Sequence, residues 1–138
     1  MDQNFEQMSK LRLEGKVALI TGAASGIGFE TCVLFAKQGC RVVCCDINEE
    51  AGNRTIRTIF DELKYNPDLD TEQRFLPAVF VKVDVSKEAQ IKAAVEVAER
   101  VFGKLNIVFN NAGRCAFTQA SCIQTTTMPC RPKSTCGI

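Results

Sequence analysis

The sequence predicts an α/β fold built on a doubly wound parallel sheet of about four strands. Short apolar runs alternate with amphipathic segments of helical length between Lys16 and Asn110, a pattern typical of right-handed βαβ units. A glycine-rich turn joins the first apolar run to the first helical segment. The 138 residues allow one domain at most.

The first strand is expected at residues 17–20, where the continuous apolar run Val-Ala-Leu-Ile is typical of a strand buried on both faces. A helix is predicted over about 26–38, and Gly39 occupies the usual place of a helix C-terminal glycine. The face of this helix that packs on the sheet is expected to carry Ile27, Thr31, Leu34 and Phe35.

The second strand is predicted at 42–45 and ends at Asp46. The next helix is expected over about 49–64, and the polar segment 66–76, which contains Pro67, is predicted to be a loop. Residues at four-residue intervals mark the buried face of this helix: Ala51, Thr55, Ile59 and Leu63.

The third strand is predicted at 78–83, ending at Asp84, and Ser86 is expected to cap the helix that follows. Gly103 ends this helix, and the fourth strand is expected at 105–109. One face of the helix presents Ile91, Ala94, Val95, Ala98 and Phe102.

Three segments are predicted in the chain: a polar leader at 1–12, the folded domain at 13–113, and an irregular or disordered tail at 114–138. The tail has no helical or strand periodicity and no Asp or Glu, so it cannot readily bury enough apolar area to offset its ordering entropy. A long loop is the alternative. The sudden change after Gly113 suggests a truncated product, such as an alternative transcript or a shifted reading frame.

Composition argues against several classes of protein. The net charge is +1 with Lys and Arg scattered, so no nucleic-acid partner is expected. No apolar stretch reaches the roughly 20 residues of a membrane span, and the leader lacks the apolar core of a secretory signal. We therefore expect a cytoplasmic protein. The eight cysteines do not have the spacing of a zinc module, so reduced thiols and no metal site are expected.

The strongest motif is the turn Thr-Gly-Ala-Ala-Ser-Gly-Ile-Gly at 21–28, between a buried strand and a helix. Gly22 permits a tight turn, Gly26 lets the backbone approach a pyrophosphate, and Gly28 lets the helix and strand pack closely. Free N–H groups and a partial positive charge at the helix start attract phosphate. The segment is therefore predicted to bind a dinucleotide.

Asp46 lies at the end of the second strand, where a carboxylate can accept hydrogen bonds from the ribose hydroxyls of adenosine. A carboxylate there repels a 2′-phosphate, and Ile47, rather than an arginine, follows it. The expected cofactor is NAD, with NADP less favoured. The alternative is a solvated Asp with a structural role only.

The spacing GxxxGxG, together with Asn-Asn-Ala-Gly at 110–113 and Asp-Val at 84–85, resembles the short-chain dehydrogenase/reductase family over about 13–113. The resemblance implies a Rossmann-like domain and NAD(P)-dependent interconversion of alcohols and ketones by hydride transfer. In a sheet ordered 3-2-1-4, both glycine motifs follow the strands that flank the ligand crevice. For Asn111, a structural role in the sheet and a direct contact with the cofactor are equally expected.

The resemblance implies a role for each part of the predicted cofactor site. Ser25 and Ile27 would line the pyrophosphate site, Asp84 and Val85 would hold the adenine, and the 110–113 turn would border the ribose and nicotinamide. The whole predicted site is Gly22, Ser25, Gly26, Ile27, Gly28, Asp46, Ile47, Asp84, Val85, Asn110, Ala112 and Gly113.

No catalytic residue is predicted. The family uses a Tyr with a Lys four residues later, a Ser and an Asn, whereas the single tyrosine here, Tyr65, is followed at that spacing by Leu69. Three functions stay open: an oxidoreductase-family product without turnover of its own, a non-enzymatic module, and an unstable product. The module would bind NAD, or pair with a full-length relative or with itself through the apolar edge of the fourth strand.

Overall fold

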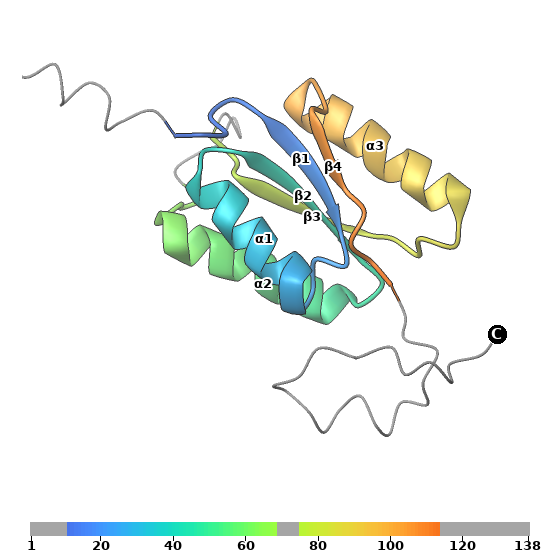
Figure 1. Ribbon diagram of the computed structural model, residues 1–138. Helices are drawn as coiled ribbons and strands as arrows, with labels where there is room; N and C mark the ends of the chain where they lie inside the picture. The colour runs from blue at the N-terminus through green and yellow to red at the C-terminus, as the bar shows by residue number, and fades with distance from the viewer. Residues whose placement is uncertain (1–10, 69–74, 114–138) are drawn as a thin grey trace, which may run out of the picture.

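The computed structural model of the chain describes residues 11–68 and 75–113. This part contains a four-stranded sheet in the order β3-β2-β1-β4, with every strand pair parallel (Figure 1). The predicted fold class and strand order are confirmed. The predicted irregular tail and most of the predicted leader lie outside the described residues.

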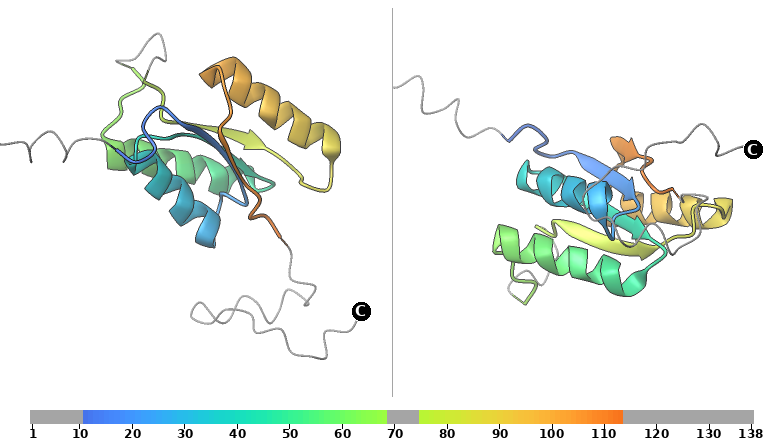
Figure 2. Two further views of the ribbon diagram at one scale, coloured as in Figure 1. Left: turned by 45° about the horizontal axis from the view of Figure 1, so that its top comes forward. Right: turned by 60° about the horizontal axis from the view of Figure 1, so that its bottom comes forward.

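Helices cover both faces of the sheet: α1 and α2 lie on one face, and α3 lies on the other (Figure 2). The ends of these elements lie within two residues of the predicted ones. The strands are β1 (Val17–Thr21), β2 (Arg41–Asp46), β3 (Ala78–Lys82) and β4 (Ile107–Phe109), and the helices are α1 (Gly26–Lys37), α2 (Glu49–Leu63) and α3 (Glu88–Phe102).

The two central strands have no polar face, because each is covered by helices on both sides. In β1, Ala18 and Ile20 pack with α1 and α2, whereas Val17 and Leu19 pack with α3. The same alternation in β2 buries cysteines as small apolar residues: Cys44 lies on the α1 side and Cys45 on the α3 side. The cysteines in the described residues, Cys32, Cys40, Cys44 and Cys45, are free thiols and buried.

The packing face of helix α1 was predicted only in part: Phe35 packs against the core as predicted, but Ile27 and Leu34 do not. Ile27 is 71% exposed and Leu34 is 57% exposed, whereas Gly28, Cys32 and Ala36 are buried. Small side chains allow the helix axis to lie close to β1, and this close approach selects the buried face. Ile27 and Leu34 are left on the outer side of the helix, whereas Val33 and Phe35 pack against the core from partly buried positions.

Helix α2 buries the predicted residues Ala51, Thr55 and Ile59. Gly52 lies directly over the ring of Phe80, where an added Cβ would collide with the ring carbons. The Asn48 side chain caps the helix start by accepting a hydrogen bond from the Ala51 N–H at 3.0 Å. The sequence pattern therefore gave the correct orientation for α2.

The start of α3 differs from the prediction. The N-cap is Lys87, which makes no side-chain cap bond, and the Ser86 hydroxyl instead donates to Asp84 Oδ1 at 2.7 Å. Ser86 lies one residue before the N-cap, and its hydroxyl donates to the neighbouring carboxylate instead of accepting from a backbone N–H at the helix start. Ile91 is 37% exposed, so it also lies off the buried face of Ala94, Ala98 and Phe102.

Strand β4 is shorter than predicted and begins at Ile107. The preceding residue, Asn106, is bonded to β1 twice: its N–H donates to Val17 O at 2.9 Å, and its Oδ1 accepts from Val17 N at 3.0 Å. Among the described residues β4 pairs with β1 alone, and Val108 is half exposed. In that part of the chain, no helix is both long and apolar enough to span a membrane.

Candidate functional site

A cavity of about 510 Å³ lies at the carboxyl ends of the four strands. The residues that line it come from the turn after β1, the ends of β2 and β3, and the turn after β4. They are Gly22, Ser25, Asp46, Ile47, Val83, Asp84, Val85, Ser86, Asn111, Ala112 and Gly113.

Most of the predicted site residues line this cavity, but some do not. Gly26, Ile27, Gly28 and Asn110 are not in the lining. Three lining residues were not predicted as site residues. Val83 and Ser86 flank the predicted Asp-Val pair, so their positions next to that pair could have identified them. For Asn111 the sequence leaves open a structural role and a contact with the cofactor.

The turn after β1 is closely packed on its inner side. Gly22 has φ +69°, and a Cβ built there would lie 2.9 Å from Asn111 Nδ2 and 3.0 Å from Ala112 Cα. A Cβ at Gly28 would collide with the Gly22 carbonyl oxygen, so only glycine lets α1 begin this close to β1. Gly26, in contrast, has φ +56° and open space around its Cβ position. The turn is therefore compact inside and accessible outside.

The start of α1 offers free backbone donors. Its N-cap, Ser25, makes no side-chain cap bond, and the first turn contains no acidic residue. The first helical hydrogen bond runs from Phe29 N to Ser25 O at 3.3 Å, so the preceding N–H groups have no intrahelical acceptor. These donors and the partial positive charge of the helix start suit an anion such as a pyrophosphate.

The Asp46 carboxylate links the end of β2 to the glycine-rich turn. Its Oδ2 accepts from the Ala24 N–H at 3.0 Å, and its Oδ1 accepts from the Asn48 N–H at 2.9 Å. These bonds fix the direction of the carboxylate at the cavity wall, and each oxygen keeps lone pairs for a further donor. A ligand with adjacent hydroxyls could occupy those acceptor positions.

The Asp84 turn, residues 84–87, forms the opposite wall. Asp84 Oδ1 accepts from both the N–H and the hydroxyl of Ser86, at 3.0 and 2.7 Å. The Asp84 N–H donates to Gln90 Oε1 at 2.7 Å, which ties the turn to the first turn of α3. Val85, in the middle of the turn, is 43% exposed and offers an apolar surface to the cavity.

Thr21 and Asn111 join the turns after β1 and β4. The buried Thr21 hydroxyl donates to Phe109 O at 3.4 Å and accepts from the N–H groups of Asn111 and Ala112 at 3.1 and 3.0 Å. Asn111 Nδ2 donates to Thr21 O at 3.2 Å and to Gly22 O at 3.5 Å. Asn111 therefore both steadies the sheet and lines the cavity. Thr21 was missed, although a polar residue ending an apolar strand was a signal.

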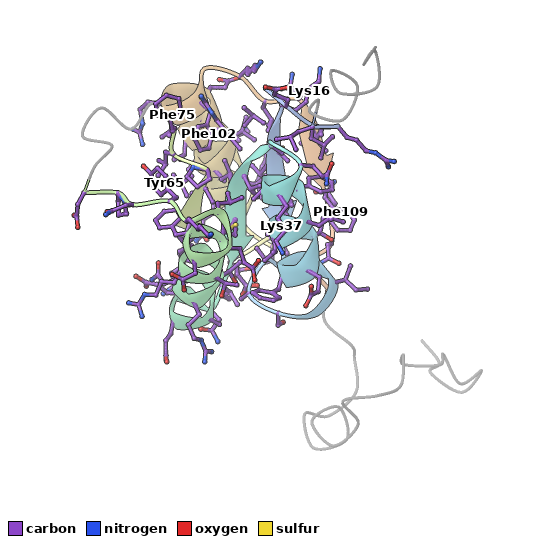
Figure 3. The ribbon with its side chains drawn as sticks, turned by 90° about the vertical axis from the view of Figure 1, so that its left-hand side faces the viewer. Lys16, Lys37, Tyr65, Phe75, Phe102 and Phe109 are labelled. Carbon is purple, nitrogen blue, oxygen red and sulfur yellow. The ribbon has the colours of Figure 1, made fainter. Side chains whose placement is uncertain are left out.

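Tyr65 lies away from the cavity, just beyond the end of α2 (Figure 3). Its ring packs edge-to-face on Phe60, with centroids 4.9 Å apart. The cavity lining contains two carboxylates, an amide and hydroxyls, but no Lys, Arg or Tyr from the described residues. These groups can bind a polar ligand by hydrogen bonds.

Comparisons with known proteins agree on one family. The family model described as short chain dehydrogenase matches residues 16–128, so the match continues past Gly113. Borneol dehydrogenase, mitochondrial, of Lavandula x intermedia is 46% identical over 102 residues, which cover 74% of this chain and 33% of that protein. The chain spans about a third of the length of the curated relatives that it matches.

Two solved structures share the fold at significant identity. A hydroxysteroid dehydrogenase from Escherichia coli is 35% identical with a TM-score of 0.65, covering 76% of this chain and 40% of that one. A short chain dehydrogenase/reductase from Burkholderia phymatum in complex with NAD is 36% identical with a TM-score of 0.61, covering 73% and 32%. This chain therefore belongs to the short-chain dehydrogenase family of NAD(P)-dependent oxidoreductases.

Proposed function

We propose that the cavity at the carboxyl end of the sheet binds NAD, with the pyrophosphate at the start of α1 and the adenosine ribose at Asp46. The observation that carries this proposal is the arrangement of the glycine-rich turn. Its outer side is open at Gly26, its helix start carries free donors, and Asp46 is bonded directly to it through Ala24. This combination fits a dinucleotide, whose phosphates and ribose hydroxyls need donors and acceptors side by side.

The remaining roles follow the order of the predicted site residues along the chain. Ser25, Gly26 and Ile27 would contact the pyrophosphate, Ile47, Asp84 and Val85 would surround the adenine, and Asn110, Ala112 and Gly113 would border the nicotinamide ribose. Gly22 and Gly28 would act by allowing close packing. Bound there, the nicotinamide would supply a hydride acceptor or donor.

The charges in the cavity favour NAD over NADP. Asp46 and Asp84 are the charged side chains among its described lining residues, and no Lys or Arg accompanies them. The 2′-phosphate of NADP would lie beside Asp46 without a cation to compensate, and like charges at that range disfavour binding.

The wider function is an oxidoreductase that interconverts alcohols and ketones, with the proton-transfer groups supplied from outside the described residues. The second candidate is a non-enzymatic NAD-binding module that pairs with a longer relative or with itself along β4. The half-exposed Val108 on that strand favours this candidate. Cytosolic location and a truncated origin stay predictions.

Calorimetric titration of the full chain with NAD and NADP tests the proposal. We expect saturable NAD binding at least about tenfold tighter than NADP binding, and Asp46→Asn should weaken NAD binding about tenfold because hydrogen bonds to a charged acceptor are lost. Asp61→Asn, an exposed carboxylate on α2, is the matched control and should bind like the wild type. Folded protein that shows no saturable NAD binding would contradict the proposal.

A further inference from the structure

We infer that Thr55, a residue of α2 outside the cavity lining, positions the Asp46 carboxylate through one peptide group and thereby sets the preference for NAD. The inference rests on the proposed function. Thr55 is 1% exposed, and its hydroxyl donates to the Ala23 carbonyl in the glycine-rich turn at 3.0 Å. It is a positioning residue, because it acts on the cofactor site through Ala23, Ala24 and Asp46.

The connection passes through the peptide between Ala23 and Ala24. The carbonyl of this peptide accepts from Thr55, and its N–H donates to Asp46 Oδ2 at 3.0 Å. Because a peptide group is planar, fixing the direction of the carbonyl also fixes the direction of the N–H. The hydroxyl on one side of the peptide therefore determines where the carboxylate is held on the other side.

The Ala23 carbonyl depends on Thr55. Ala23 is fully buried, and in the described part of the chain no backbone N–H is bonded to its oxygen. The Thr55 hydroxyl also donates to Ala51 O at 3.2 Å, so its one proton is shared between two acceptors, but Ala51 O is in addition the regular helical acceptor of the Thr55 N–H. Loss of the hydroxyl would thus leave a buried carbonyl without a partner, and the peptide would rotate to find one.

The preceding peptide is already anchored, which leaves this one as the adjustable link. The Ala23 N–H donates to Cys45 O at 3.1 Å, so the entry to the turn is bonded to β2. The hydrogen bonds from Thr55 to Ala23 and from Ala24 to Asp46 then form a continuous series, in which each polarises the next. A stronger Ala24 donor holds the carboxylate more firmly.

The second oxygen of Asp46 is also connected to α2. Oδ1 accepts from the N–H of Asn48, the residue whose side chain caps α2. Both carboxylate oxygens are therefore held from one helix, through Thr55 at its middle and Asn48 at its start. An element that supplies none of the described lining residues controls the carboxylate that distinguishes the two nucleotides.

The test compares Thr55→Val, which removes the hydroxyl at nearly constant shape, with Thr55→Ser, which keeps it. The matched control is Thr58→Val, because the exposed Thr58 hydroxyl on the same helix donates only within the helix, to Arg54 O at 3.0 Å. Thr55→Val should raise the Kd for NAD about tenfold and change that for NADP much less. Thr55→Ser and Thr58→Val should stay within about twofold of the wild type.

A double-mutant cycle with Asp46→Asn separates positioning from a general loss of stability. If Thr55 acts through Asp46, the tenfold effect of Thr55→Val on NAD binding should shrink to about twofold or less in the Asp46→Asn background. The same loss in both backgrounds overturns the inference, as does a Thr55→Val protein that binds NAD like the wild type.

Hydrogen exchange of the Ala24 amide, followed by NMR without nucleotide, gives an independent readout. Thr55→Val should accelerate this exchange and Thr58→Val should not; equal rates overturn the inference. If the valine variant does not fold, Thr55→Ala replaces it, and Thr55→Ser binding NAD about tenfold more weakly than the wild type counts against the inference. If the wild type binds no NAD, the proposed function fails, while Ala24 exchange still decides the link to Thr55.

Discussion

The two walls of the cavity are held in different ways. The glycine-rich turn, residues 21–28, is bonded to β2 through Cys45 and Asp46, to α2 through Thr55, and to the turn after β4 through Asn111. The Asp84 turn uses near neighbours in sequence: Ser86, Lys87 and Gln90. The first wall therefore takes its shape from assembly of the whole sheet, whereas much of the second is formed locally. Substitutions in the first wall should affect folding and binding together.

The largest loss of stability is expected from substitution of Gly28, where α1 meets the glycine-rich turn. Gly28→Ala places a methyl group against the Gly22 carbonyl, and overpacking of backbone against backbone should lower the free energy of unfolding by about 3 kcal/mol. Urea denaturation measures the change. Gly113→Ala is the control in the cavity lining, since its Cβ would meet open space, and equal stability of the two variants would contradict the close packing.

A smaller loss of stability is expected from substitution of Thr21, which joins the turns after β1 and β4. Thr21→Val leaves the partly buried N–H groups of Asn111 and Ala112 without their acceptor, which should lower the free energy of unfolding by about 2 kcal/mol. Differential scanning calorimetry can compare it with Thr31→Val, whose hydroxyl donates to Ile27 O on the exposed side of α1. If the two valine variants have the same Tm, Thr21 does not join the two turns.

The smallest effect is expected in the Asp84 turn. Ser86→Ala removes an exposed hydroxyl bond to Asp84 but leaves the Ser86 N–H bonded, so stability should change by less than about 0.5 kcal/mol. The same denaturation measurement checks this. A loss as large as that of Thr21→Val would show that the two walls do not differ as described.

The sequence predicted the fold well, because strand order and element limits follow from local periodicity and from the glycine motifs. It failed for part of the packing face of α1, where Gly28, Cys32 and Ala36 are buried while the larger Ile27 and Leu34 are exposed. Hydrophobicity marks a face that avoids water, but close approach to a strand selects small side chains. The pattern of α2 has no such conflict, and its buried face was predicted correctly.

The candidate site was predicted in outline, since its turns carry glycine and Asp-Val motifs. The residues that hold those turns were not. Thr21 reaches Asn111 over 90 positions and Thr55 reaches Ala23 over 32, and no local pattern indicates a hydrogen bond at such separations. The four-residue spacing predicts only that Thr55 lies on the buried face of its helix. The partner of its hydroxyl becomes evident only in the folded structure, where Ala23 lies beside it.

The buried thiols in β2 and beside it can report how often this part of the molecule opens. Burial raises the pKa of Cys40 to about 11 and of Cys45 to about 12, and a hydrogen bond that the Cys44 thiol donates to Cys32 raises the pKa of Cys44 together with burial. The thiolate is the form that attacks alkylating reagents, so at neutral pH these sulfurs react only when β2 separates from its neighbours. Peptide mapping after timed labelling would therefore measure how often β2 is released from its neighbours.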